Sequence, residues 1–131
     1  MTDPRPIFEY LVKTALLADP EITGYIADRI TPVKRHAEAA FPSLTYTVIT
    51  DPLIWGCMGY AHIQVSCFAL TYDAARHLEK RVQAVLDDLG VDGTGIEISG
   101  IDTDLPGMRG YEPDTGVYHH AVDALVTYIY R

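Results

Sequence analysis

The chain has 131 residues, of which 48% are hydrophobic, and a formal net charge of −8, so we expect one acidic globular domain over residues 1–131. No apolar run reaches the roughly 20 residues that cross a bilayer, and the N-terminus lacks a signal-peptide pattern, which predicts cytoplasmic production and no membrane partner. The surplus of carboxylates disfavours non-specific binding to nucleic-acid phosphates. Two cysteines, Cys57 and Cys67, are too few for a disulfide framework.

The first third of the chain carries helical signals and then a short strand. Apolar residues at helical spacing predict a helix over residues 6–18 and a shorter helical turn over 20–26. Asp19-Pro20 interrupts the two. Residues 29–31 are expected to form a strand that Pro32 stops.

Residues 44–50 alternate with β-branched and aromatic side chains, which predicts a strand. The connection that follows, residues 51–59, is unusually apolar for a hairpin loop. It is expected either to fold over its own core or to form an arm that packs on another molecule, because Trp and Met are favoured at interface centres. Its candidate contact residues are Leu53, Ile54, Trp55 and Met58.

The stretch from Tyr60 to Gly90 organises the chain, because a long alternating strand runs directly into an amphipathic helix. Asp73 is the expected N-cap of that helix and Gly90 its C-terminal residue. The strand directs five small or apolar side chains to one side: Ala61, Ile63, Val65, Cys67 and Ala69.

The last third is predicted to hold two strands, over residues 96–101 and 117–130, with a bulge at Gly100 in the first. Residues 102–116 form a long connection that is either functional or flexible. Its candidate contact residues are Met108, Arg109, Tyr111 and Asp114. The elements together predict an α+β fold, a mainly antiparallel sheet of about four to five strands with two helices packed on one face.

Signals for catalysis or metal binding are weak. His119 and His120 are neighbours on a strand, so they point to opposite faces and cannot share a metal ion. No nucleophile elbow, zinc-protease or phosphate-loop pattern occurs. We therefore expect no enzymatic activity, no metal and no cofactor. Asp123 interrupts the last strand, either as an exposed-face residue or as the partner of an arginine across a strand or subunit boundary.

Four stretches carry a family resemblance. Ala27-Asp-Arg-Ile-Thr-Pro32 follows a short helix, and Phe41-Pro-Ser-Leu-Thr-Tyr46 opens the first long strand. Residues 63–75 join a strand to a helix, and Tyr111-Glu-Pro-Asp-Thr-Gly-Val-Tyr118 closes the chain, with Asp123 five residues on. In this order, and over nearly the whole chain, they resemble the small tail-completion or tail-terminator proteins of long-tailed phages and phage-like particles. Two departures are Ala27, where the family usually has glycine, and Phe68, where it usually has tryptophan.

This resemblance implies a structural virion protein without catalytic residues. It implies a homo-oligomeric ring, usually of six copies, that caps the major tail tube protein and joins the tail to a head-completion or connector protein. Its place would be the neck of the virion tail, after production in the host bacterial cytoplasm. DNA would pass through the ring without specific binding, which agrees with an acidic chain.

Two other hypotheses are compatible with the sequence. The first is a dimeric α+β domain that binds a small molecule or acts as an enzyme, with His62, His119 and Asp123 in a pocket. Replacing His119 would abolish activity under that hypothesis, and would leave tail joining nearly intact under the terminator hypothesis. The second is a general protein-interaction module of a bacterial cytoplasm, which differs from the terminator only in its partner.

Overall fold

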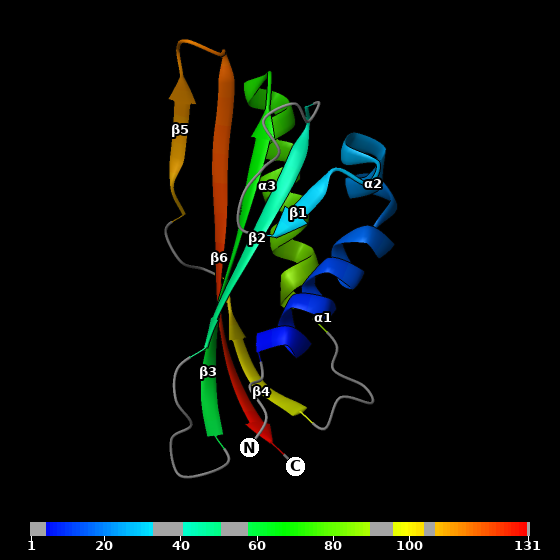
Figure 1. Ribbon diagram of the computed structural model, residues 1–131, viewed down its shortest axis with the longest axis vertical. Helices are drawn as coiled ribbons and strands as arrows, with labels where there is room; N and C mark the ends of the chain where they lie inside the picture. The colour runs from blue at the N-terminus through cyan, green and yellow to red at the C-terminus, as the bar shows by residue number, and fades with distance from the viewer. Residues whose placement is uncertain (1–4, 33–40, 51–57, 90–95, 104–106, 131) are drawn as a thin grey trace.

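The computed structural model describes residues 5–32, 41–50, 58–89, 96–103 and 107–130. Within these ranges three helices lie against one face of a twisted six-stranded sheet that is antiparallel except at one edge (Figure 1). The predicted α+β class is confirmed. The described residues contain one helix and one strand more than predicted.

The helices follow the predicted positions closely. Helix α1 spans Arg5–Ala18, α2 spans Pro20–Ile26 and α3 spans Tyr72–Asp87. Thr71, and not Asp73, caps α3, because its hydroxyl accepts the Ala74 N–H at 3.2 Å while Asp73 already lies in the first turn. Gly90, the expected C-terminal residue, lies outside the described residues.

The strands are β1 (Ile30–Pro32), β2 (Ser43–Thr50), β3 (Met58–Ala69), β4 (Ile96–Asp102), β5 (Arg109–Glu112) and β6 (Val117–Tyr130). Their order is β1-β2-β3-β6-β4, and β5 also pairs with β6. Strand β1 runs parallel to β2 at an edge and ends at Pro32, which is its last residue, so the strand ends one residue later than predicted. An edge strand tolerates proline because its outward side needs no ladder donor.

The core lies between the sheet and the helices. The five inward residues predicted on the central strand are all fully buried in β3. Helices α1 and α3 contribute the buried stripes Phe8, Val12 and Leu16, and Ala75, Leu78, Val82 and Leu86. No helix among the described residues is long and apolar enough to cross a membrane.

Strand β6 carries two partners in succession along the same edge. Strand β4 pairs with residues 125–130 of β6, and β5 pairs with residues 117–120. The register of β4 shifts between Ile98 and Gly100, which places the bulge at Ser99 and confirms the predicted irregularity. Strand β5 lies inside the segment that was predicted to be a long connection. That expectation is wrong because β5 is only four residues long and fully exposed, so it lacks a hydrophobic pattern.

Candidate interaction surface

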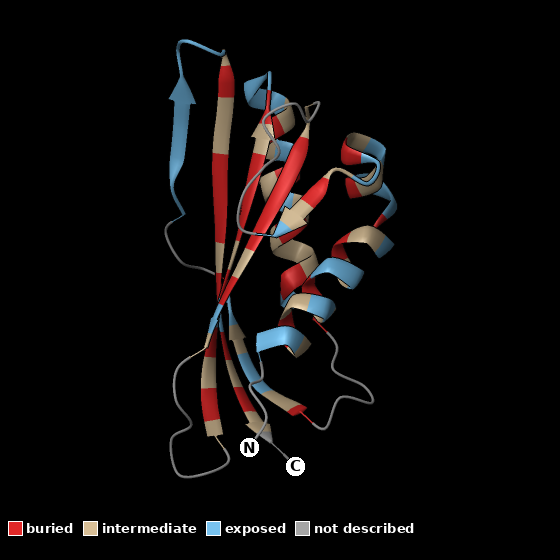
Figure 2. Ribbon diagram, viewed as in Figure 1, coloured by how far each residue is buried: buried red, intermediate tan, exposed pale blue. Residues whose placement is uncertain are grey.

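The hairpin of β5 and the start of β6 projects beyond the helix layer (Figure 1). Every β5 residue is exposed, and Figure 2 shows β5 without a buried position. The Gly116 N–H donates to the Glu112 carbonyl at 2.8 Å, and Gly116 has a φ of +71° that suits glycine. The hairpin is therefore ordered, and its outer strand β5 is exposed.

A carboxylate on α3 holds this hairpin to the body of the protein. Glu79 accepts a hydrogen bond from the Arg109 guanidinium at 2.8 Å through one oxygen. Its other oxygen lies 2.9 Å from Nδ1 of His120, a side chain that is only 2% exposed. Hydrogen bonding to Glu79 raises the pKa of Arg109, so the guanidinium stays charged. One glutamate therefore connects α3 to both strands of the hairpin.

Tyrosine rings extend the contact toward the start of α3. The rings of Tyr111 and Tyr118 lie 4.6 Å apart, and Tyr118 meets Tyr72 edge-on at 6.0 Å. Tyr72 also contacts the ring of His120 at 5.4 Å. Tyr111 nevertheless stays 54% exposed and Tyr72 44% exposed. Exposed tyrosines on an ordered frame are typical of protein-binding surfaces.

The outer edge of β5 pairs with no other strand among the described residues. Ala121 donates its N–H to the Met108 carbonyl at 2.8 Å, so residues 108 and 121 form a hydrogen-bonded pair. Such pairs alternate along an antiparallel ladder, which directs the N–H and C=O groups of Arg109 and Tyr111 away from β6. An exposed edge of this kind accepts further backbone partners.

The structure gathers some of the predicted contact residues at this hairpin. Met108 is 59% exposed and precedes β5, Arg109 and Tyr111 belong to it, and Asp114 lies exposed in its turn. Met58 begins β3 and pairs with Ile129, near the opposite end of β6. The remaining three, Leu53, Ile54 and Trp55, lie outside the described residues. That all of these residues contact a partner stays a prediction.

The histidine pocket does not assemble. His62 Nε2 lies 3.3 Å from the Asp123 carboxylate, and the Gln64 amide donates to that carboxylate at 3.1 Å. His119 pairs instead with Phe68, four residues along β6 from Asp123, and stacks on that ring at 4.5 Å. Burial, and secondarily the adjacent His120, lowers the pKa of His119. The sheet therefore separates one member of the expected trio. Within the chain Asp123 pairs with His62 and Gln64, and an arginine partner across a subunit boundary stays a prediction.

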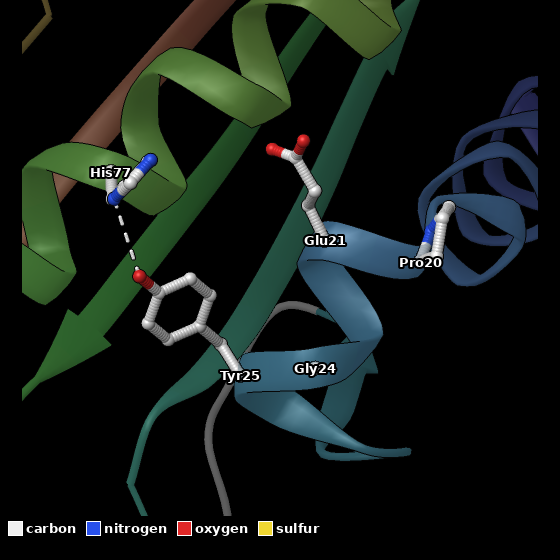
Figure 3. A pocket seen from close by; sticks show the side chains of 5 residues that line it. All are labelled: Pro20, Glu21, Gly24, Tyr25 and His77. Atoms are coloured by element: carbon white, nitrogen blue, oxygen red, sulfur yellow. Dashed lines mark hydrogen bonds between the residues drawn. The ribbon is translucent and has the colours of Figure 1, made fainter.

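A trough between α2 and α3 escaped the sequence prediction. The Tyr25 hydroxyl lies 3.2 Å from Nδ1 of His77, beside a hollow of about 450 Å³ that Pro20, Glu21 and Gly24 also line (Figure 3). A second hollow of about 420 Å³ shares His77 and is lined by Asp73, Arg76, His77 and Lys80. The available signal was the spacing of Arg76, His77 and Lys80 on one side of a helix whose opposite side is apolar.

Within the described ranges no three His, Cys, Asp or Glu side chains are arranged to hold a metal ion. Cys67 is fully buried, and burial, with a further contribution from Glu79, raises the pKa of its thiol. A protonated, inaccessible thiol is a poor nucleophile. Cys57 lies outside the described residues.

Comparison with known proteins identifies structural but not sequence neighbours. No family model matches the chain, and no curated protein matches it. The fold is shared with a chain of the virion of a native gene transfer agent particle, with a TM-score of 0.71 and 13% identity over 90% of this chain and 91% of that one. A second solved chain, whose name states no role, has a TM-score of 0.51 and 14% identity over 94% and 95%. At these identities the similarity shows a common fold.

Proposed function

We propose that this protein is a structural virion protein of a long-tailed phage or phage-like particle, and that it acts as a tail terminator. In this role several copies, typically six, form a ring that caps the tail tube and joins the tail to the connector beneath the head. The observation that carries the proposal is the near-complete match in fold to a chain of a gene transfer agent virion. The four family-like stretches of the sequence point the same way and do not depend on the fold.

The surface described above supports one of the contacts that a ring requires. A closed ring is built from head-to-tail contacts, which require two different complementary patches on each subunit. The β5–β6 hairpin, with Tyr111 and Met108 exposed and Glu79 holding its base, is a suitable first patch. The segment over residues 51–57 stays a proposed contact to the tube or connector.

Charge agrees with a channel for DNA. The net charge of −8 per chain multiplies in a ring, so DNA would be repelled from the wall and not gripped. Screening limits this repulsion to a Debye length of about 8 Å at physiological salt, so it acts on DNA that comes close to the wall. The DNA would thus pass without specific binding.

The test is native mass spectrometry and negative-stain imaging of the purified protein, alone and mixed with tail tubes. We expect ring-shaped oligomers, or density that caps tube ends and prevents further tube growth. A monomer or dimer that never binds tubes would contradict the proposal. Tail-like particles assembled without this protein should have tubes of uncontrolled length that fail to join heads.

A further inference from the structure

Two cations on α3 form no ion pair with any described residue, although the chain is strongly acidic. Arg76 and Lys80 lie one turn apart on the side of α3 that faces away from the sheet. Most other described basic side chains are engaged: Arg81 with Asp19, Arg109 with Glu79, Arg29 with backbone carbonyls, and Arg5 with another residue. Unengaged cations side by side in a chain of charge −8 indicate a surface for a negatively charged partner.

The two cations line a shallow, open hollow. It shares His77 with the hollow that Tyr25 lines, and Figure 3 shows Tyr25 and His77 beside that second hollow. Asp73 lines the first hollow and Glu21 the second, and Glu21 lies 3.6 Å from Arg81. The trough formed by the two hollows therefore combines two cations, an aromatic ring and two carboxylates.

The hairpin tip carries the opposite charge. Glu112 and Asp114 are exposed at the turn between β5 and β6, and neither forms an ion pair with another described residue. Tyr111 precedes them and exposes more than half of its side chain. The tip thus combines two unengaged carboxylates with an aromatic side chain.

We propose that the trough over Arg76, His77 and Lys80 receives the Glu112–Asp114 tip of a second copy of this chain. The proposal rests on the proposed ring, for which it names the receiving surface. The two patches lie on different elements of one chain, so the contact is head-to-tail and can close a ring. Complementary charges at such a contact mainly set the partner and the rate of association.

A second copy fits the trough better than DNA does. Nucleic-acid surfaces present many cations along a path, whereas this trough offers two cations together with two carboxylates that would repel a phosphate backbone. The Glu112–Asp114 tip carries two carboxylates, which match the two cations in number and charge.

The decisive experiment is a charge exchange, measured by sedimentation velocity of the full chain over a range of concentrations. The trough variant carries Arg76→Glu and Lys80→Glu, and the tip variant carries Glu112→Lys and Asp114→Lys. Each variant alone should associate about tenfold more weakly or worse, because like charges then face one another. Combining all four substitutions in one chain should restore association, since the charges are again complementary.

The matched control carries Arg5→Glu and Lys13→Glu on α1, which changes the net charge by as much as the trough variant without touching either patch. It should associate like the unmodified chain. Circular-dichroism melting of every variant separates lost association from lost folding. Raising the salt concentration should weaken association of the unmodified chain and of the four-substitution chain alike.

Three results would overturn the contact: a trough variant that associates like its control, a four-substitution chain as weak as its parents, or an unmodified chain that stays monomeric throughout. Normal association with lost binding to duplex DNA would assign the cations to nucleic acid. Capping of tail tubes is measured separately, by negative-stain imaging. Self-association through this contact without capping contradicts the terminator role alone, and capping by the trough variant at unchanged potency contradicts the contact alone.

Discussion

Strands β4 and β5 pair with the same edge of β6, yet different forces hold them in place. Strand β4 contributes Ile96, which is 5% exposed, and Ile98 and Ile101, which pack against the core. Strand β5 has no buried residue and relies on its ladder, the Glu79 contacts and one tilted ring contact. A fully buried aliphatic side chain contributes about 1.5–3 kcal/mol, whereas an exposed ion pair contributes at most about 1 kcal/mol. The β4 half of the edge is part of the core, and the β5 half is an attachment.

Helix α3 forms two arginine–carboxylate pairs, one with the N-cap residue of α2 and one with the hairpin. On one side Arg81 donates two hydrogen bonds, at 2.8 and 2.6 Å, to one oxygen of Asp19, whose side chain is 6% exposed. On the other side Glu79, at 17% exposed, binds Arg109. The more deeply buried pair ties the helices together, and the more open pair holds the hairpin. The protein can therefore present a projecting hairpin without weakening its core.

The largest loss of stability is expected from a substitution in the part of β6 that pairs with β4. Tyr128 on β6 is fully buried, pairs with Ile98 of β4 and meets the ring of Phe8 edge-on at 5.1 Å. Tyr128→Ala should lower the free energy of unfolding by about 3–5 kcal/mol, measured by urea denaturation. Tyr118→Ala, in the hairpin half of the same strand, is the matched control and should cost much less. Equal losses would show that the hairpin belongs to the core.

Acid should weaken the contact between Asp19 and the helices, and the expected loss of stability is intermediate in size. Hydrogen bonds from Arg81 outweigh burial and, with those from the Ile22 and Glu21 N–H groups, lower the pKa of Asp19 below its usual value. A carboxyl with a lowered folded-state pKa adds stability above its unfolded-state pKa, and that stability is lost as the pH falls through the folded-state value. Asp19→Ala should cost about 1–3 kcal/mol at neutral pH through loss of the cap and the ion pair.

The measurement is urea denaturation of both proteins at a series of pH values. The difference between Asp19→Ala and the unmodified chain should be constant near neutrality and shrink below about pH 4, where the aspartate of the unfolded chain begins to bind protons. A difference that persists unchanged into strong acid would show that the Asp19 charge contributes nothing. Other carboxyl groups titrate in both proteins and largely cancel in the difference.

The same contrast explains what the sequence could predict. Core elements carry periodic apolar patterns, so β6 and the buried face of β3 matched the expectation residue by residue, and α3 was found with its cap displaced by two residues. Strand β5, whose sequence is Arg-Gly-Tyr-Glu, has no such pattern. Its pairing is specified by a tight turn and by a glutamate 30 residues away on α3, and such long-range contacts leave no local signal.

The candidate surface was likewise only partly predictable from the sequence. The length of the 102–116 connection and the family resemblance pointed to Met108, Arg109, Tyr111 and Asp114 before their hairpin was known. The trough was missed because three basic residues on a helix are usually a solvated face, and only the fold shows that none of the described residues forms an ion pair with Arg76 or Lys80. The histidine trio was wrong for the converse reason. Strand periodicity fixes the face on which a residue lies, but the register between strands decides which residues meet.

The smallest effect on overall stability, and the sharpest test of the comparison, is expected from Glu79→Gln. Glutamine keeps the shape of the side chain but removes the charge that binds Arg109 and faces His120. The free energy of opening the hairpin should fall by about 1–2 kcal/mol, which raises the exchange rate about five- to thirtyfold. The Ala121 N–H reports this opening in hydrogen-exchange NMR, because it donates across the ladder to Met108. Amides of β3, such as Val65, should exchange as before.

Glu21→Gln is the matched control, because Glu21 is an exposed glutamate on α2 outside the hairpin. It should leave Ala121 exchange unchanged. If Glu79→Gln speeds exchange at Ala121 and Val65 equally, the hairpin and core open together and the distinction between attachment and core fails. If it changes neither, the ladder alone holds β5. A selective increase at Ala121 would mean that the rigidity of the hairpin, and with it the geometry that it offers a second copy, is set by one carboxylate on α3.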